Sequence, residues 1–449
     1  MQPTALLILP EVKSLLEKGD IAELRETLAH LHAADVAAII VEIEDDDAKT
    51  LFLASIEDER VEIFEHLDET EQERLLHLVG AKAMIPIVEE MASDDRADLI
   101  QSLPTRLADA LLKELPRPEQ KDVEALVKYP EKTAGAIMTS EWASVPADAT
   151  AAEALVHLRK VAPHRETIYF IYVTNPDRTL IGVLSLKDLV LADPESSVRS
   201  IMVPDVISMP VEADQEFVAS KIAHYDFLAM PIVDSANRIV GIVTHDDAID
   251  VIEEETTEDA QRMGAVTPLE DSYLETSFWQ IIRKRGLWLA ALFIGTMFTG
   301  TALKHYENAI ALLPALVIFI PLIISTGGNT GSQSATLVIR ALAVGDVHLR
   351  DWAHIMWRET RTGMALGLFL GLFGIARALL WGTGFPIAIV VGLTLLGIVF
   401  WGALAGSILP LGLRRVGLDP AIASAPFVAS LVDVSGILLY FTIARFVLP

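Results

Sequence analysis

Phe427–Tyr440 reads FVASLVDVSGILLY, and its one charged side chain, Asp433, lies near the middle of the last apolar segment long enough to cross a bilayer. A carboxylate near the centre of a membrane costs at least about 2.5 kcal/mol, so such groups usually face a bundle interior or a water-filled path. The alternative is an aspartate that hydrogen-bonds between helices and serves packing alone. The stretch predicts a helical membrane domain and makes Asp433 a candidate for an ion path through it.

Five apolar stretches of spanning length or nearly so follow the basic run Arg283–Arg285. When they are assigned to alternate sides of a membrane, nine Lys and Arg residues fall on one side and three on the other. The positive-inside rule therefore predicts a multi-pass protein with residues 1–285 in the cytoplasm and the C-terminus outside. The stretches are 286–304, 309–341, 357–380, 386–413 and 421–448.

The second stretch carries Pro314 and Pro321 and then the run STGGNTGSQS at residues 325–334. Glycines and side-chain amides at membrane depth predict a broken helix, because irregular backbone is tolerated there only where protein buries it or water lines it. The freed carbonyls, with Asn329 and Gln333, would then hold the water shell of an ion. The alternative is a continuous helix whose glycines form a contact surface for a neighbouring helix.

Charge is distributed unevenly along the 449 residues. Residues 271–449 hold eight acidic and twelve basic side chains, a net charge of +4, so residues 1–270 carry −31 when the whole chain carries −27. An acidic half of this size argues against a nucleic-acid partner and suits a cation. The absence of cysteine excludes thiolate metal sites, disulfides and thiol catalysis.

Short helices are predicted for the first part of the acidic half. From about residue 10 to 129, apolar residues recur at helical spacing, and Leu31–Ile40, Leu67–Leu76 and Met91–Ile100 resemble one another. Each such unit needs a neighbour to bury its apolar face, which predicts a stack of helices like a solenoid.

The second part of the acidic half contains an internal duplication. Ile137-Met138 returns as Ile201-Met202, and GVLSLKD at 182–188 returns as GIVTHDD at 241–247. A small hydroxyl and an Asp at each helix start can cap that helix, or offer donors for a phosphate and a carboxylate for a ribose. The pattern resembles a tandem cystathionine-β-synthase (CBS) domain pair, a module that commonly binds adenine nucleotides.

One long acidic helix is predicted from Asp246 to about Gly264. Its acids form one stripe that repels itself unless cations neutralise it, although a solvated face is the alternative explanation. Cations between these acids and those of the earlier domains would favour a compact form, which we expect to be the closed one. The stripe consists of Asp247, Asp250, Glu254 and Glu258, with Glu255 and Asp259 beside it.

The order of these parts resembles the MgtE magnesium transporter family over essentially the whole chain. The resemblance is carried by PLIISTGGNTGSQSATLVIR at 321–340, SAPFVASLVDVSG at 424–436, SDDRAD at 93–98 and the duplicated module with its acidic helix. The implied fold is multidomain, with an all-α, superhelical N-terminal domain, an α+β tandem CBS domain pair and a five-helix transmembrane domain. The expected bounds are 1–132, 133–252 (repeats 133–200 and 201–252), 246–270 for a connecting or plug helix, and 271–449.

The resemblance implies a homodimeric, Mg²⁺-selective channel in the lipid bilayer of the cell inner membrane, gated by cytoplasmic Mg²⁺ and modulated by ATP. Asp433 corresponds to the pore carboxylate, and Ala425 and Ser332 stand where Asn is frequent in the family. The regulatory adenine nucleotide would contact Phe170, Lys187, Asp188 and Phe227. The remaining acids that correspond to metal ligands are Glu62, Asp94, Asp98, Asp214, Glu216, Asp226, Asp247, Asp250, Glu255, Glu258 and Asp259.

Two other functions are left open by the sequence: transport of another divalent cation such as Co²⁺, Ni²⁺ or Zn²⁺, and a membrane-anchored CBS nucleotide sensor without transport. An enzyme is not expected, because the sequence shows no nucleophile–base constellation and no phosphate-cradling Gly-Lys motif. The histidines show no zinc-type spacing, and we interpret His30 and His32 as surface residues.

Overall fold

The computed structural model describes residues 3–269, 273–274, 276–312 and 314–448. The chain forms two compact units, Met1–Glu253 and Glu254–Pro449.

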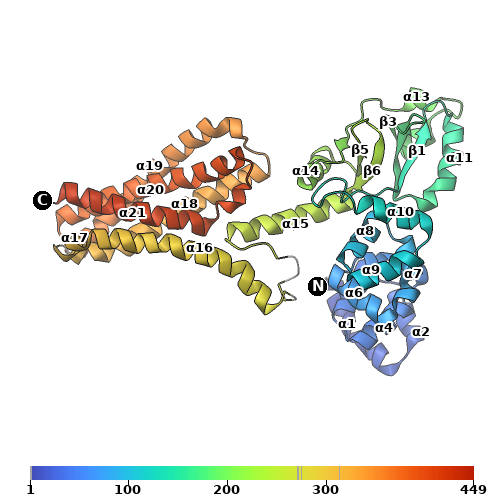
Figure 1. Cartoon of the computed structure of the whole chain (residues 1–449), viewed down its shortest axis with the longest axis horizontal. Helices are drawn as coiled ribbons and strands as arrows, with labels where there is room; N and C mark the ends of the chain where they lie inside the picture. The colour runs from blue at the N-terminus through green and yellow to red at the C-terminus, as the bar shows by residue number, and fades with distance from the viewer. Residues whose placement is uncertain (1–2, 270–272, 275, 313, 449) are drawn as a thin grey trace. The chain divides into compact units, whose positions relative to one another are not determined.

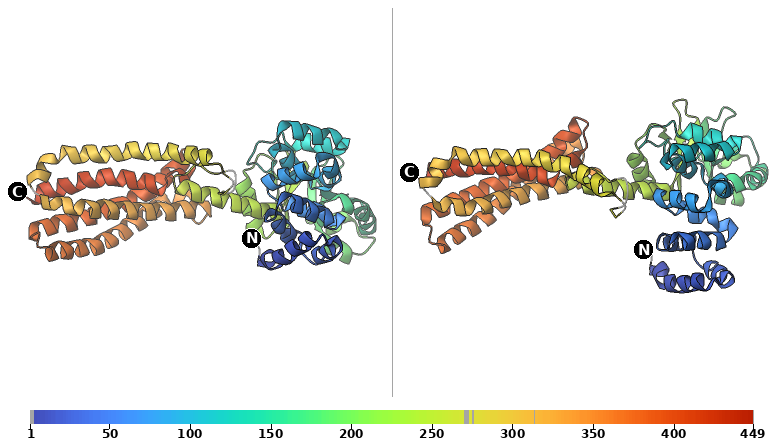
Figure 2. Two further views of the ribbon diagram at one scale, coloured as in Figure 1. Left: turned by 90° about the horizontal axis from the view of Figure 1, so that it is seen from below. Right: turned by 60° about the horizontal axis from the view of Figure 1, so that its bottom comes forward.

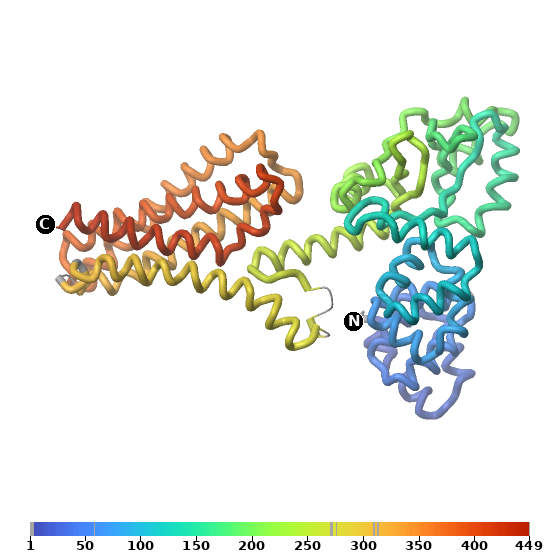
Figure 3. The backbone as a smooth tube through the Cα atoms, viewed as in Figure 1, coloured from blue at the N-terminus to red at the C-terminus, as the bar shows by residue number. Residues whose placement is uncertain are grey.

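The first unit begins with a stack of short helices (Figures 1 and 3). Each helix from α1 to α8 packs against the helix two positions later in the chain, so successive pairs share one apolar core that runs from Ala5 to Val123. This is the predicted solenoid-like arrangement. Polar caps separate the helices, for example Asp20 and Asp68, whose carboxylates accept the N–H groups of Glu23 and Glu71. The helices are α1 (Pro3–Lys18), α2 (Ile21–Leu28), α3 (Ala33–Val41), α4 (Asp45–Ala54), η1 (Glu57–Glu59), α5 (Arg60–Glu65), α6 (Glu69–Val79), α7 (Ala81–Glu90), α8 (Ser93–Ser102), α9 (Thr105–Glu114) and α10 (Arg117–Leu126).

Two three-stranded sheets follow, with orders β1-β2-β3 and β4-β5-β6. In each sheet the first pair of strands is parallel and the second antiparallel, as expected for a duplicated module. The elements are β1 (Trp142–Pro146), α11 (Ala151–Val161), η2 (Ala162–His164), β2 (Thr167–Thr174), β3 (Leu180–Ser185), α12 (Leu186–Leu191), α13 (Val198–Ile201), β4 (Met209–Pro210), α14 (Gln215–Tyr225), β5 (Ala229–Val233) and β6 (Ile239–Thr244).

One methionine of each repeat packs against a glycine of the other repeat. A Cβ built on Gly182 in β3 would lie 2.5 Å from the sulfur of Met202, and one built on Gly241 in β6 would lie 2.6 Å from the sulfur of Met138. Each repeat therefore needs a glycine where the methionine of the other repeat packs. This explains why the Ile-Met and Gly positions recur together in the sequence, and it joins the repeats into one body.

Helix α15 (His245–Met263) is the predicted long acidic helix. Its first turns pack in the first unit through Ala248 and Val251, both buried. Its last turns belong to the second unit, where Met263 packs against the core.

Five helices of the described second unit are long and apolar enough to cross a membrane, as predicted. They run side by side in Figure 2, and α20 packs against α18, α19 and α21, while α16 packs against α21. Almost all of α16 lies on the surface of the bundle. The elements are α16 (Phe278–His305), α17 (Glu307–Leu312), η3 (Pro314–Phe319), α18 (Ile320–Ala343), η4 (Leu349–Asp351), α19 (Trp352–Leu380), α20 (Phe385–Arg415), η5 (Pro420–Ile422) and α21 (Ala425–Val447).

The predicted break in the glycine-rich run is wrong, because α18 is one continuous helix through residues 325–334. The irregular backbone lies earlier, at the 3₁₀ turns Pro314–Phe319. The glycines instead bring two helices together: a Cβ built on Gly402 of α20 would lie 2.7 Å from the carbonyl oxygen of Gly327 in α18. Small residues spaced by four along a membrane helix permit such close backbone approach. The contact-surface alternative is therefore the correct one.

Candidate functional site

A group of acids joins α8 to the start of α15 within the first unit. Asp94, at the N-terminus of α8, is 7% exposed. Its Oδ1 is buried without a hydrogen-bond partner among the described residues. Asp247 lies in the first turn of α15. Its carboxylate accepts two hydrogen bonds from Thr244, one from the Thr244 backbone N–H at 3.2 Å and one from the Thr244 hydroxyl at 2.5 Å. A buried carboxylate oxygen without a partner is costly, so the arrangement favours a cation or a proton at Asp94.

The electrostatics of the group point the same way. Burial raises the pKa of Asp94 well above its usual range, and the charges of Asp247, Asp95 and Glu166 raise it further. Burial and then Asp247 raise the pKa of Asp95 to about 7. Burial raises the pKa of Asp247 to about 6, although its hydrogen bonds from Thr244 act in the opposite direction. Each carboxylate therefore disfavours the ionisation of its neighbours.

Sequence reasoning missed part of this group. Burial and then Asp95 raise the pKa of Glu65 to about 8, while the Ala92 N–H donates to Glu65 at 3.1 Å and lowers it. Glu166 lies just before β2; its charge raises the pKa of Asp94, and the charge of Asp95 raises the pKa of Glu166. Asp95 could have been found from its place in SDDRAD, but Glu65 and Glu166 carry no signal in the sequence, because only the fold brings them to α8.

The other predicted acids of the first unit are more dispersed. Glu62, Asp98 and Asp250 are all exposed residues. The carboxyl of Asp250 is nevertheless partly shielded from water: this partial burial and the charge of Asp246 raise its pKa, while His66 lowers it. Among them, Asp250 is within electrostatic reach of Asp95, and Glu62 of Glu65.

Three predicted ligands lie at the two ends of helix α14, two at its start and one at its end. Asp214 is its N-cap and accepts the Phe217 N–H at 3.2 Å, and Glu216 follows in the first turn. Asp226 ends the helix in a left-handed conformation with φ of 54°. A helix of 11 residues is about 16 Å long, so Asp226 and Asp214 do not belong to one metal site within a single chain.

The C-terminal turns of α15 contain a second group, in the second unit. Arg262 donates to the carboxylates of Glu258 and Asp419, so a cation already bridges α15 to the loop before α21. Burial, Asp419 and Glu255 raise the pKa of Asp259. Three predicted residues, Glu255, Glu258 and Asp259, thus lie in one group, and Asp419 is a member that the sequence did not indicate.

Asp433 is half-buried on α21 and lies against α18. A Cβ built on Gly328 would be 3.5 Å from Asp433 Oδ1. Asn329 and Gln333 are exposed on the same helix as Gly328. Ser332 donates its hydroxyl to the carbonyl oxygen of Ala425 at 3.0 Å, so the two positions where the resemblance implies a frequent Asn contact each other.

Three of the four predicted nucleotide contacts lie in the first repeat. Phe170 in β2 pairs with Ser185 in β3, and Ser185 donates its hydroxyl to Asp188 at 2.6 Å. Lys187 adjoins Asp188 in the first turn of α12. Phe227 belongs to the second repeat, where its ring stacks on that of Tyr225 at 5.3 Å. Phe170 does not take part in this stack and packs against the core cluster that contains Tyr172 and Ile242.

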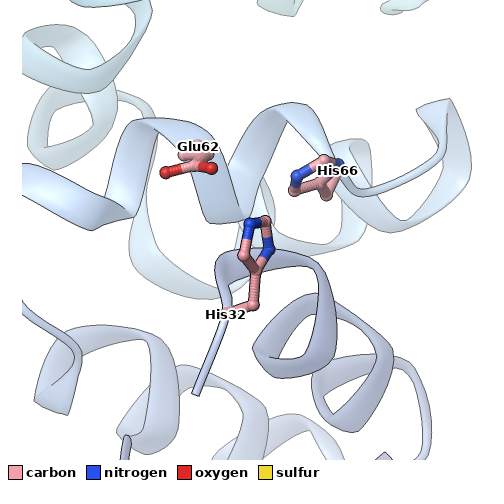
Figure 4. A group of neighbouring side chains, drawn as sticks. All are labelled: His32, Glu62 and His66. Carbon is pink, nitrogen blue, oxygen red and sulfur yellow. The ribbon is translucent and has the colours of Figure 1, made fainter. Parts of the chain in front are cut away.

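A further group of possible metal ligands contains two histidines that lie far apart in the sequence. His32 is exposed, as expected, but its ligand atoms lie within 4.8 Å of those of Glu62 and His66 (Figure 4). The spacing of the histidines in the sequence gave no sign of this group, because it is the packing of α3 against α5 that brings the two histidines together.

The comparison with protein families gives matches in the order of the elements. The family described as MgtE, divalent cation transporter, matches residues 320–443, and the MgtE intracellular N domain matches residues 31–132. The CBS domain matches twice, at 134–195 and 198–254.

Similar proteins and structures extend these matches. The magnesium transporter MgtE of Thermus thermophilus is 40% identical over 443 residues, 97% of this chain and 98% of that protein. The one of Bacillus subtilis is 33% identical over 434 residues, 96% of this chain and 95% of that protein. The solved cytosolic domain of the Mg²⁺ channel MgtE in complex with ATP is 37% identical, with a TM-score of 0.52, and the match covers 54% of this chain and 99% of that one. Helical domain, CBS pair and membrane helices are thus those of one family, and the chain belongs to the MgtE family of magnesium transporters.

Proposed function

We propose that this protein is a Mg²⁺-selective channel whose conduction is shut by Mg²⁺ bound between its acidic cytoplasmic elements. The observation that carries the proposal is the buried carboxylate of Asp94, whose Oδ1 has no hydrogen-bond partner among the described residues and whose pKa the charges of Asp247 and Asp95 raise. The described arrangement is compact, and its acids repel one another. Two carboxylates about 4 Å apart repel by roughly 4 kcal/mol at an effective dielectric constant near 20, so a divalent cation stabilises this arrangement strongly.

Mg²⁺ suits such a group. It prefers carboxylate oxygens, retains several of its waters and needs only a few protein ligands. Several weak sites that fill together give a steep response, because each bound ion lowers the repulsion that opposes the next. When cytoplasmic Mg²⁺ falls, repulsion among these acids expands the first unit, moves α15 and frees the pore. A ligand shifts such an equilibrium only through its different affinity for the two forms, and the acid group supplies that difference.

The ion path is proposed to pass Asp433. The carboxylate is half-buried and the amides of Asn329 and Gln333 are exposed, and we propose that the three share one surface of the bundle. A second copy of the chain, facing this surface, would place two such carboxylates around a hydrated ion, and a homodimer is therefore part of the proposal. We propose the orientation that the basic loops favour, with the acidic unit in the cytoplasm below the inner membrane.

ATP is proposed as a modulator bound by Lys187 and Asp188 at the start of α12, with Phe170 and Phe227 near the base. The solved relative in complex with ATP supports a nucleotide, and the Ser185–Asp188 hydrogen bond holds the carboxylate in place for a ribose.

The decisive experiment is patch recording of the reconstituted protein with Mg²⁺ varied on the cytoplasmic face. We expect Mg²⁺ currents that close as cytoplasmic Mg²⁺ rises through the millimolar range. Currents that pass Co²⁺ or Ni²⁺ equally well would favour a general divalent-cation channel. A protein that binds nucleotide but passes no ion would overturn the proposal in favour of a sensor.

A further inference from the structure

A group of mixed ligands lies on the surface of the helical domain, apart from the proposed pore carboxylate. His32 is the residue before α3, while Glu62 lies in α5 and His66 directly follows it. The spacing of four places Glu62 and His66 on one face of the helix. The rings of the two histidines are 6.1 Å apart between centroids. Figure 4 shows the three side chains converging from two helices.

This donor set differs from that of the acid group around Asp94. Two imidazole nitrogens and one carboxylate oxygen, with ligand atoms within 4.8 Å of one another, are close enough for one ion. Imidazole is a ligand for Zn²⁺, Cu²⁺, Ni²⁺ and Fe²⁺, whereas Mg²⁺ selects oxygen. Three protein ligands leave positions open for water, as in many zinc and non-haem iron sites. The geometry points to a site for a divalent transition-metal ion at His32, Glu62 and His66, and this inference does not depend on the proposed channel function.

The local structure shows what binding would cost. His32 Nδ1 accepts the Ala34 N–H at 3.3 Å, a long hydrogen bond at an exposed helix end. A neutral imidazole that binds a metal has a proton on its other nitrogen, so the metal displaces this hydrogen bond whichever nitrogen it uses. Loss of a helix cap costs about 1 kcal/mol, and water satisfies the released N–H at the surface.

The chain supplies a matched control. His77 and Glu73 are also four residues apart on one helix, α6, with Nε2 3.5 Å from Oε1. They belong to no group of three ligands among the described residues. A metal held by any exposed His–Glu pair would bind there equally well.

The test titrates Co²⁺ into the full-length, detergent-solubilised protein in excess Mg²⁺ and follows binding by visible absorption and calorimetry. The variants are His32→Asn, which keeps a good helix cap, and His66→Gln, with His77→Gln as control. We expect both site variants to weaken the first Co²⁺ binding event by at least about tenfold, since even outer-shell changes cost 10- to 100-fold. The control should bind as the unmodified protein does.

Two results would overturn the inference: Co²⁺ affinity equal to that of the unmodified protein in both site variants, or complete displacement of Co²⁺ by Mg²⁺ at low millimolar concentration. The second result would mean that oxygen ligands alone hold the ion. Because both histidines are exposed, the two variants test the same site independently, and circular dichroism of each establishes that its fold is kept.

Discussion

Asp433 and Gly328 meet between α21 and α18, where a Cβ on the glycine would lie 3.5 Å from Asp433 Oδ1 and 3.3 Å from the Ala429 Cβ. The glycine leaves the carboxylate room beside the helix, and its neighbour Gly327 faces Ile398 and Val432. The glycine-rich run thus has two tasks: one side packs the bundle, and the adjacent side borders the acid that we place on the ion path.

Replacing Asp433 by Asn separates the ion-path role from a packing role. Asn keeps the size and the hydrogen-bonding capacity of the side chain but removes its charge. We expect Mg²⁺ uptake into liposomes to fall at least about tenfold, because the loss of a pore charge removes the main attraction for the ion. Membrane insertion should be unchanged. Normal uptake by the variant would leave Asp433 with packing alone.

Gly328→Ala should reduce conduction without unfolding the bundle. The added methyl group is in tight but tolerable contact with Ala429 and crowds the Asp433 carboxylate. Single-channel recording should show a lower conductance for Mg²⁺. Gly300→Ala on α16, where a Cβ would meet nothing within 4 Å, is the matched control and should conduct normally. Equal conductance in the two variants would show that the space beside Asp433 is irrelevant to the ion.

Combined replacement of Asp94, Asp98 and Asp247 by Ala should leave a channel that conducts at high cytoplasmic Mg²⁺. The metal loses its ligands, while Glu65, Asp95 and Glu166 still repel one another and keep the unit expanded. Patch recording with Mg²⁺ on the cytoplasmic face measures this directly. Closure by Mg²⁺ at the normal concentration would rule out this acid group as the sensor.

The raised pKa values predict how pH acts on the first unit. Asp247, Asp95 and Glu65 have pKa values of about 6, 7 and 8 in the folded unit, against values near 4 in an unfolded chain. Because the folded unit binds these protons more tightly, its metal-free stability is highest below the unfolded pKa values and falls as pH rises through about 6 to 8. Mg²⁺ replaces the protons, so the stabilisation by Mg²⁺ should grow over that range.

Hydrogen–deuterium exchange of α8 peptides, corrected for the intrinsic exchange rate, measures this difference. Protection in Mg²⁺ and in metal-free buffer should be similar at pH 5 and diverge towards pH 8. A gap that stays constant with pH would mean that protons and Mg²⁺ do not compete for these carboxylates.

Much of the fold could be predicted because it is periodic or repeated. The apolar stretches around Asp433 indicated the membrane helices, and the recurrence of Met138 and Met202 indicated two repeats. The glycine-rich run was misinterpreted because glycine breaks helices in water, whereas in α18 it lets α20 approach.

The candidate site was only partly predictable for a different reason. Asp94 and Asp247 were found through family resemblance, but Glu65, Glu166 and Asp419 join their groups through packing between distant segments. His32 and His66 are separated in the sequence by α3, α4, η1 and α5 and meet only in space. Spacing along the chain contains no information about such contacts.

Arg262 offers a test of the second acid group. In the described structure its guanidinium ties Glu258 of α15 to Asp419 before α21. Arg262→Ala removes this tie and leaves two carboxylates facing each other, so closure should depend more heavily on Mg²⁺. Because the Arg262 side chain is about one-third exposed, we discount the contribution of its ion pairs to the closed form to about 1 kcal/mol. This corresponds to roughly a fivefold rise in the Mg²⁺ concentration that half-closes the channel. Arg262→Lys keeps the charge and should restore most of the normal midpoint in patch recordings. A midpoint that is unchanged or lower in Arg262→Ala would show that this ion pair does not help to hold the channel shut.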